Sequence, residues 1–141
     1  MNRMIAPLLL ASLSLVACGG AAPSTTAVPT TTAPTLDGSS YEVTLEFPGE
    51  APVEDTLGFA SGRFESTACT GFGFPRWTEY GARIDAGALA FDVVTHHPHG
   101  GSIAWHGTVR GDSVQGTADR TLDGKLAHGA FHGQVAMGRA P

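Results

Sequence analysis

The feature that most constrains this chain is a two-residue alternation of apolar and polar side chains that begins near residue 41. Tyr41, Val43 and Leu45 alternate with Glu42 and Thr44. Successive side chains of a strand point to opposite faces of a sheet, so this period is typical of strands with one buried face. Turn-forming residues recur about every ten residues, as they do between the short strands of all-β domains. The sequence therefore predicts an all-β domain over residues 41–137, followed by a tail at residues 138–141.

Two turn dipeptides, Gly111-Asp112 and Asp123-Gly124, predict how the last strands pair. These strands are expected near residues 102–110, 113–120 and 126–136. The rows predicted on the packed face are Trp105/Ala118/Gly129, Gly107/Gly116/Phe131 and Val109/Val114/Gly133. The opposite face collects the polar residues Thr108, Arg110, Gln115, Asp119, His128 and His132. A slip of one residue would bury these polar groups, so the pattern specifies the register.

Earlier strands are expected over residues 41–47, in the two arms of a hairpin that turns at Ser61-Gly62, and near residues 78–84 and 89–93. Together with the last three, they make about eight antiparallel strands in sequence order. Tight turns between sequential strands favour an up-and-down barrel, because closure leaves no unpaired edge. A β-sandwich with a similar number of strands is the alternative.

The pattern Trp-x-Gly-x-Val-x-Gly-Asp-x-Val-x-Gly, which lies within residues 103–116, resembles hairpins of lipocalin-like and avidin-like small β-barrels. The first strand lacks the Gly-x-Trp signature of true lipocalins, and the domain is shorter than a usual lipocalin. The resemblance therefore implies the barrel architecture and no particular ligand.

The N-terminus has the order of an export signal. Met-Asn-Arg is followed by an apolar run over residues 4–17 and then by Cys18. The run is shorter than the ~20 residues that a membrane-spanning helix needs. Residues 1–17 are therefore interpreted as a signal peptide.

Leu15-Val16-Ala17-Cys18 resembles the lipobox of bacterial lipoproteins. The resemblance implies cleavage after Ala17 and lipidation of the Cys18 thiol, which would anchor the exported protein to a membrane without a spanning helix. Gly19 is not the Asp that tends to hold enteric lipoproteins at the inner membrane, so both the cell membrane and the outer membrane stay open as destinations. The protein would face the periplasm or the cell surface.

Residues 18–40 are rich in Pro, Thr and Ala. Such a tract buries too little apolar surface to order itself, and its prolines keep it extended. Fully extended, about 20 residues reach on the order of 60 Å. We interpret residues 18–40 as the lipidated cysteine and a flexible tether.

The chain carries 8 Lys+Arg against 13 Asp+Glu, a net charge of −5, which argues against nucleic acid as a partner. It has 2 Cys, and lipidation of Cys18 would leave Cys69 without an intramolecular disulfide partner. Three roles are open for Cys69: a small buried residue, a contact to a ligand or partner, and a reactive thiol.

Two further groups of residues are candidates for chemistry. His96, His97 and His99 are close enough in sequence to suggest a metal site, although adjacent strand residues point to opposite faces and turn histidines are commonly solvated. The aromatic, glycine-rich segment at residues 72–77 would be either a lid over a barrel mouth or a plug that fills it. The candidate ligand-binding residues are Phe72, Phe74, Arg76, Trp77, Tyr80 and Trp105.

The sequence contains no nucleophile elbow, phosphate loop or zinc-protease motif. It therefore favours a non-enzymatic binding or envelope module without a cofactor, whose partner is a small apolar ligand or an envelope protein. The first alternative is a metal- or thiol-dependent enzyme that uses His96, His97 and His99 or Cys69. The second is a purely structural envelope lipoprotein with a fully packed barrel.

Overall fold

A computed structural model describes Gly20 and residues 32–137. The expected signal peptide, Cys18, most of the expected tether and the tail at residues 138–141 lie outside the described residues. Within the described part of the chain, no helix is both long and apolar enough to cross a membrane.

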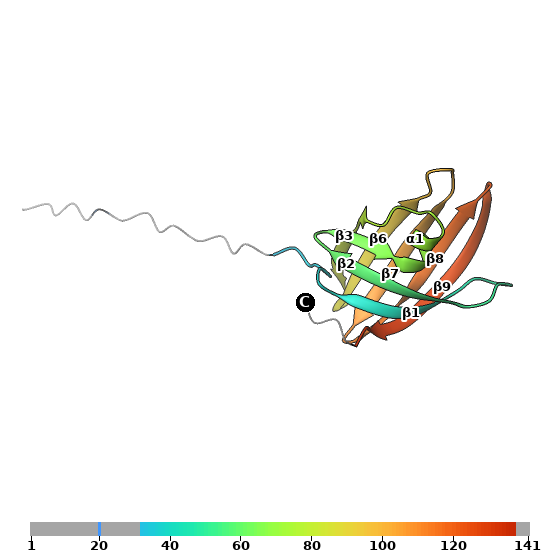
Figure 1. Ribbon diagram of the computed structural model, residues 1–141. Helices are drawn as coiled ribbons and strands as arrows, with labels where there is room; N and C mark the ends of the chain where they lie inside the picture. The colour runs from blue at the N-terminus through green and yellow to red at the C-terminus, as the bar shows by residue number, and fades with distance from the viewer. Residues whose placement is uncertain (1–19, 21–31, 138–141) are drawn as a thin grey trace, which may run out of the picture. The chain divides into compact units, whose positions relative to one another are not determined.

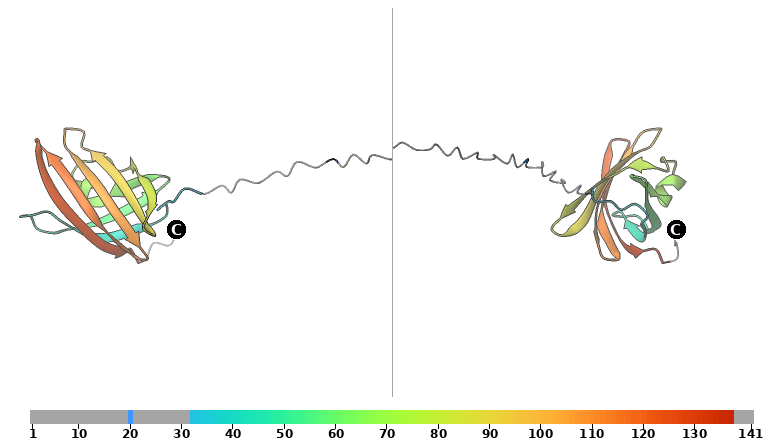
Figure 2. Two further views of the ribbon diagram at one scale, coloured as in Figure 1. Left: turned by 180° about the vertical axis from the view of Figure 1, so that it is seen from behind. Right: turned by 90° about the vertical axis from the view of Figure 1, so that its left-hand side faces the viewer.

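Within residues 32–137, nine strands and one short helix make up the domain (Figure 1). The strands are β1 (Ser40–Glu46), β2 (Val53–Ala60), β3 (Arg63–Ser66), β4 (Thr78–Glu79), β5 (Gly81–Asp85), β6 (Ala88–His96), β7 (Ser102–Arg110), β8 (Ser113–Leu122) and β9 (Lys125–Val135). The helix, α1 (Thr67–Gly71), follows β3. All neighbours pair antiparallel in the order β4-β3-β2-β1-β9-β8-β7-β6-β5, so the first strand pairs with the last. The sheet curls into a nearly closed barrel (Figures 1 and 2), which confirms the predicted fold class.

Only Tyr80 separates β4 from β5, and this residue explains why nine strands appear where about eight are expected. Thr78 and Glu79 pair with β3, whereas residues 81–85 pair with β6. The segment over residues 78–85 is therefore one bent strand that passes from one edge of the sheet to the other. Its bend nearly closes the barrel at the only seam where two sheet edges meet in the described domain.

The predicted register of the last three strands is confirmed. Trp105 is paired with Ala118, and Gly116 lies between Gly107 and Phe131. The turn at Asp123-Gly124 has positive φ at both residues, 47° and 72°, as a type I′ hairpin requires.

The middle of the barrel is filled by aromatic side chains. Trp105 packs against Phe64 and Phe131, with ring centroids 5.4 and 5.6 Å apart, and Phe59 packs against Phe91 at 5.0 Å. A Cβ on Gly116 would lie 2.7 Å from the Phe131 ring, so this row needs a glycine beside the large residue. His128 and His132 are exposed on the other face, as the alternation predicts.

One end of the barrel is closed by residues that precede β1. Leu36, which the sequence analysis places in the tether, is only 3% exposed and belongs to the core. The Leu36 amide donates to the Tyr80 hydroxyl at 2.8 Å, and that hydroxyl donates to Asp37 Oδ1 at 3.0 Å. The Asp37 carboxylate in turn accepts the Gly62 amide at 2.9 Å. Ordered packing therefore begins before the expected domain boundary at residue 41.

Candidate functional site

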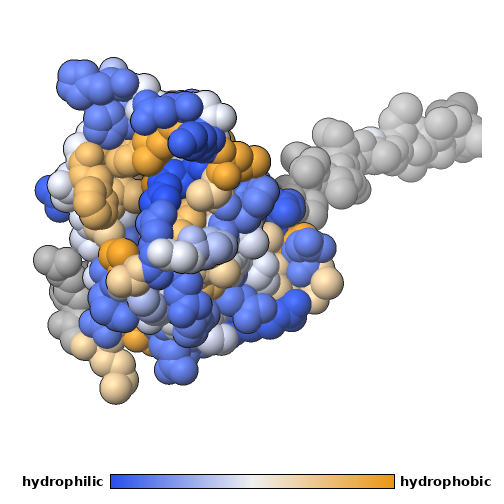
Figure 3. Space-filling model, turned by 90° about the vertical axis from the view of Figure 1, so that its right-hand side faces the viewer, coloured by the Kyte–Doolittle hydropathy of each residue, from blue (hydrophilic) through white to orange (hydrophobic). Residues whose placement is uncertain are grey.

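The opposite end of the barrel contains a cavity of about 480 Å³. Its wall is built by the end of β1 and the following loop, by α1 and the segment after it, by the β6–β7 loop and by the end of β8. The apolar lining residues are Leu45, Phe47, Val53, Phe72, Phe74, Ile103 and Leu122. Figure 3 views the domain from this side, where apolar patches lie among hydrophilic residues. The polar lining side chains are Glu50, Cys69, His97, His99 and Arg120.

The alternation of β7 and β8 determines which of their residues reach this cavity. Ile103 precedes Trp105 on the inward face of β7, one step nearer the open end. Arg120 follows Ala118 on the inward face of β8 and is paired with Ile103. The barrel therefore presents an apolar residue and a cation side by side at its mouth.

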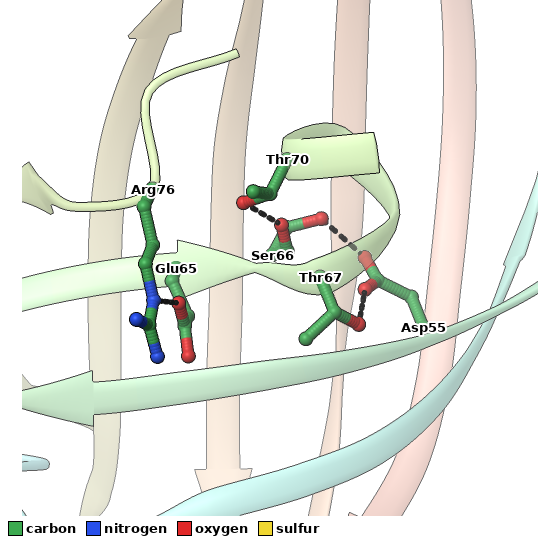
Figure 4. Close-up of polar contacts among 6 residues, drawn as sticks. All are labelled: Asp55, Glu65, Ser66, Thr67, Thr70 and Arg76. Atoms are coloured by element: carbon green, nitrogen blue, oxygen red, sulfur yellow. Dashed lines mark hydrogen bonds and ion pairs between the residues drawn. The ribbon is translucent and has the colours of Figure 1, made fainter. Parts of the chain in front are cut away.

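A buried carboxylate fixes the position of α1 (Figure 4). Asp55 on β2 accepts hydrogen bonds from the hydroxyls of Ser66 and Thr67, at 2.5 and 3.0 Å, and from the Ala68 amide at 2.9 Å. Ser66 caps the helix, because its hydroxyl oxygen accepts the Cys69 amide at 3.1 Å. These bonds satisfy the Ala68 and Cys69 amides at the start of α1 and hold Cys69 in the cavity wall.

Cys69 is free and buried. The pKa of its thiol is raised to about 11, mainly by burial. The Ser66 hydrogen bond lowers this pKa, and the nearby Asp55 charge raises it. The thiolate is the nucleophilic form of cysteine, so a thiol with this pKa is protonated and unreactive at neutral pH. The role as a small buried residue fits this environment best.

His97 holds two loops together at the mouth. Its Nδ1 accepts the His99 amide at 3.0 Å, so Nε2 carries the ring proton and donates to the Phe72 carbonyl at 3.2 Å. The Phe74 ring meets the imidazole edge to face, with centroids 5.1 Å apart. His97 therefore acts as a link between the β6–β7 loop and the segment after α1.

The structure brings two of the three candidate metal ligands together: the rings of His97 and His99 lie 5.6 Å apart between centroids, and both line the cavity. His97 is engaged by the His99 amide and the Phe72 carbonyl, and His96 is exposed. Within residues 32–137 and Gly20, no three His, Cys, Asp or Glu side chains lie close enough to hold a metal ion.

Of the six residues proposed for ligand binding, the structure brings Phe72 and Phe74 into the cavity wall. The other four lie elsewhere. Arg76 pairs with Glu65 at 2.8 Å on the outside, and its guanidinium stacks with Trp77 at 5.6 Å. Tyr80 belongs to the closed end, and Trp105 lies in the core, fully buried.

Arg120 and Glu50 are charged lining residues that are absent from the predicted ligand-binding residues. The guanidinium carbon of Arg120 lies 4.1 Å from the Phe47 ring centroid, and its Nη1 donates to Glu50 Oε2 at 3.1 Å. The hydrogen bond from Arg120 holds the pKa of the Glu50 carboxyl below its usual range. The predicted register offers a signal for Arg120, because Val114, Gly116 and Ala118 already define the inward face.

Comparison of the chain with protein-family models, with curated proteins and with solved structures finds no match. What the site can do is therefore inferred from its own geometry. It offers an apolar cavity, a protonated thiol, an imidazole with both nitrogens hydrogen-bonded and one arginine–carboxylate pair. Such a set can enclose an apolar molecule and orient one polar group of it.

Proposed function

We propose that this chain is an exported, membrane-anchored lipoprotein whose β-barrel is a non-enzymatic binding module for a small, largely apolar ligand. The observation that supports the binding role is the cavity of about 480 Å³ with an apolar wall. Ligand sites typically enclose about 300–1,000 Å³ and place a few polar groups in an apolar lining. The proposed anchor rests on the lipobox at residues 15–18.

The arrangement of the chain ends suits this role. The Ala136 amide donates to the Ser40 carbonyl at 2.8 Å, so the domain's first and last strands meet beside the closed end. Residues 32–39 therefore enter the domain at the end away from the cavity.

The environments of Cys69 and His97 favour binding over catalysis. A thiol with a pKa of about 11 is a weak nucleophile at neutral pH, and both ring nitrogens of His97 are already engaged. Neither group is poised to start a reaction, whereas both contribute surface to the cavity wall.

Binding is tested by titrating the full chain with a neutral naphthylamine fluorophore. Val53→Trp places a large side chain in the cavity wall and should abolish saturable binding. Val94→Trp makes the same change on the exposed outer side of β6 and should bind as the unmodified chain does. If neither variant loses binding, or if the unmodified chain shows no saturable binding, the proposed ligand site is contradicted. The purely structural envelope role would then remain.

Anchoring is tested separately by metabolic labelling with a fatty acid in a bacterial host. The unmodified chain should incorporate label and fractionate with membranes, and Cys18→Ala should do neither. Cys69→Ala is the matched control and should be labelled normally, because its thiol is buried. Label on the Cys18→Ala chain would exclude the proposed lipidation site.

A further inference from the structure

Arg120 is an unusual residue for an apolar cavity wall. It lies on the inward face of β8 opposite Ile103, and its side chain is only 23% exposed. An arginine in such a place loses hydration and therefore needs a compensating partner. Among the described residues that line the cavity it is the one permanent cation.

The partner of Arg120 is Glu50, which approaches from the loop between β1 and β2. Both carboxylate oxygens are used: Nη1 donates to Oε2 at 3.1 Å, and Nη2 donates to Oε1. This is the two-pronged geometry in which a guanidinium recognises a planar carboxylate. The site therefore already shows that a carboxylate fits against Arg120 at the mouth of the cavity.

The two members of the pair are held very differently. Arg120 lies on a strand that is paired on both sides, and its guanidinium is stacked on Phe47 at 4.1 Å. Glu50 lies on a connecting loop, next to Gly49 with a φ of +79°, and its side chain is 49% exposed. Glu50 can therefore turn into solvent at little cost, whereas Arg120 cannot leave the wall.

We propose that the cavity takes an amphipathic carboxylate, whose acid group binds Arg120 in place of Glu50 while its apolar body lies against Leu45 and Ile103. This inference rests on the proposed binding function and adds the chemical class of the ligand. Glu50 is then an internal competitor that keeps Arg120 neutralised while the cavity is empty of ligand. A neutral apolar molecule of the same length gains the wall contacts but not the bond to Arg120.

The rest of the lining supports this assignment. Both ring nitrogens of His97 are engaged, Nδ1 by the His99 amide and Nε2 by the Phe72 carbonyl, and the Cys69 thiol is protonated at neutral pH. Neither group competes with Arg120 for the ligand's acid group. Arg120 and Glu50 thus supply the ion pair at the mouth.

The test compares decanoate with decanol as ligands of the full chain at neutral pH, measured by calorimetry. Decanoate is ionised there, since carboxyl pKa values lie near ~4. The unmodified chain should prefer decanoate. Arg120→Met should lower the ratio of decanoate affinity to decanol affinity by about tenfold or more, as expected for a lost charge-assisted bond. Glu50→Gln should raise this ratio, because the internal competitor loses its charge.

Association of these ligands outside the cavity is measured with Val53→Trp, which blocks the cavity, and is subtracted before the decanoate-to-decanol ratios are compared. The carboxylate assignment is overturned if Arg120→Met does not lower the ratio or if Glu50→Gln lowers it. In that case, decanol binding would still support the cavity as a ligand site. Binding of neither ligand to the unmodified chain overturns the assignment together with the binding function. Glu50→Gln keeps the test decisive if Arg120→Met fails to fold.

Discussion

The two ends of this barrel use polar side chains for opposite purposes. At the closed end, the Tyr80 hydroxyl and the Asp37 carboxylate bond to backbone amides, and Leu36 fills the space beneath them. At the open end, Arg120 and Glu50 bond to each other beside a cavity that no side chain fills. The polar groups of the closed end bond to the backbone and hold the chain together there, whereas Arg120 and Glu50 bond to each other, and under the proposed function a ligand takes the place of Glu50.

The difference follows from what lies beyond the aromatic middle of the barrel. Toward the closed end, the chain folds back before β1 and brings Leu36 into the core. Toward the open end, the loop between β1 and β2 and the β6–β7 loop form a rim around the opening. The segment after α1 borders the opening with two aromatic side chains: Phe72 is largely exposed, whereas Phe74 is buried and belongs to the core.

The largest expected loss of stability concerns the aromatic core between the two ends. Phe131→Ala should lower the free energy of unfolding by about 3–5 kcal/mol, as truncation of a large core aromatic does. His132→Ala, on the exposed face of the same strand, should change it by less than about 0.5 kcal/mol. Chemical denaturation of the two variants measures both values, and equal losses would refute the inward assignment of Phe131.

Replacing one leucine by alanine at each end compares how tightly the two ends are packed. Leu36→Ala at the closed end should cost about 2–4 kcal/mol, because Leu36 is 3% exposed and its removal leaves a void. Leu122→Ala at the open end should cost less than about 1 kcal/mol, because Leu122 is 41% exposed. Thermal unfolding followed by circular dichroism decides this, and a larger loss at Leu122 would mean that the open end is the sealed one.

A smaller effect concerns Cys69 in the cavity wall. Its pKa rises from 9.0 to about 11 through burial, so the folded state holds the thiol proton more tightly than the unfolded state does. The stability that this provides is complete below about pH 9 and is lost as pH rises toward 11. Denaturant titrations should show a decline of about 2 kcal/mol over this range that Cys69→Ala lacks. Identical alkaline profiles of the two chains would show that the thiol is not buried in solution.

Much of the barrel follows from neighbouring residues in the sequence. The alternation on β7, β8 and β9 and the turns between them are local features, and together they fix the pairing of Trp105 with Ala118 and of Gly116 with Phe131. The same alternation places Arg120 on the inward face of β8. The rule also places Trp105 in the core, where it is too deep to serve the ligand-binding role that its aromatic character suggests.

The sequence by itself determined most of the strands and the register of the last three, because side-chain period and turn chemistry act over a few residues. Only the tertiary structure decided which end is open. The pairing of Arg120 with Glu50 joins positions 70 apart, and the contact of Tyr80 with Leu36 joins positions 44 apart. Neither contact leaves a local pattern in the chain. Closure of the sheet creates both ends at once, and the loops that happen to meet at each end determine whether it is sealed or hollow.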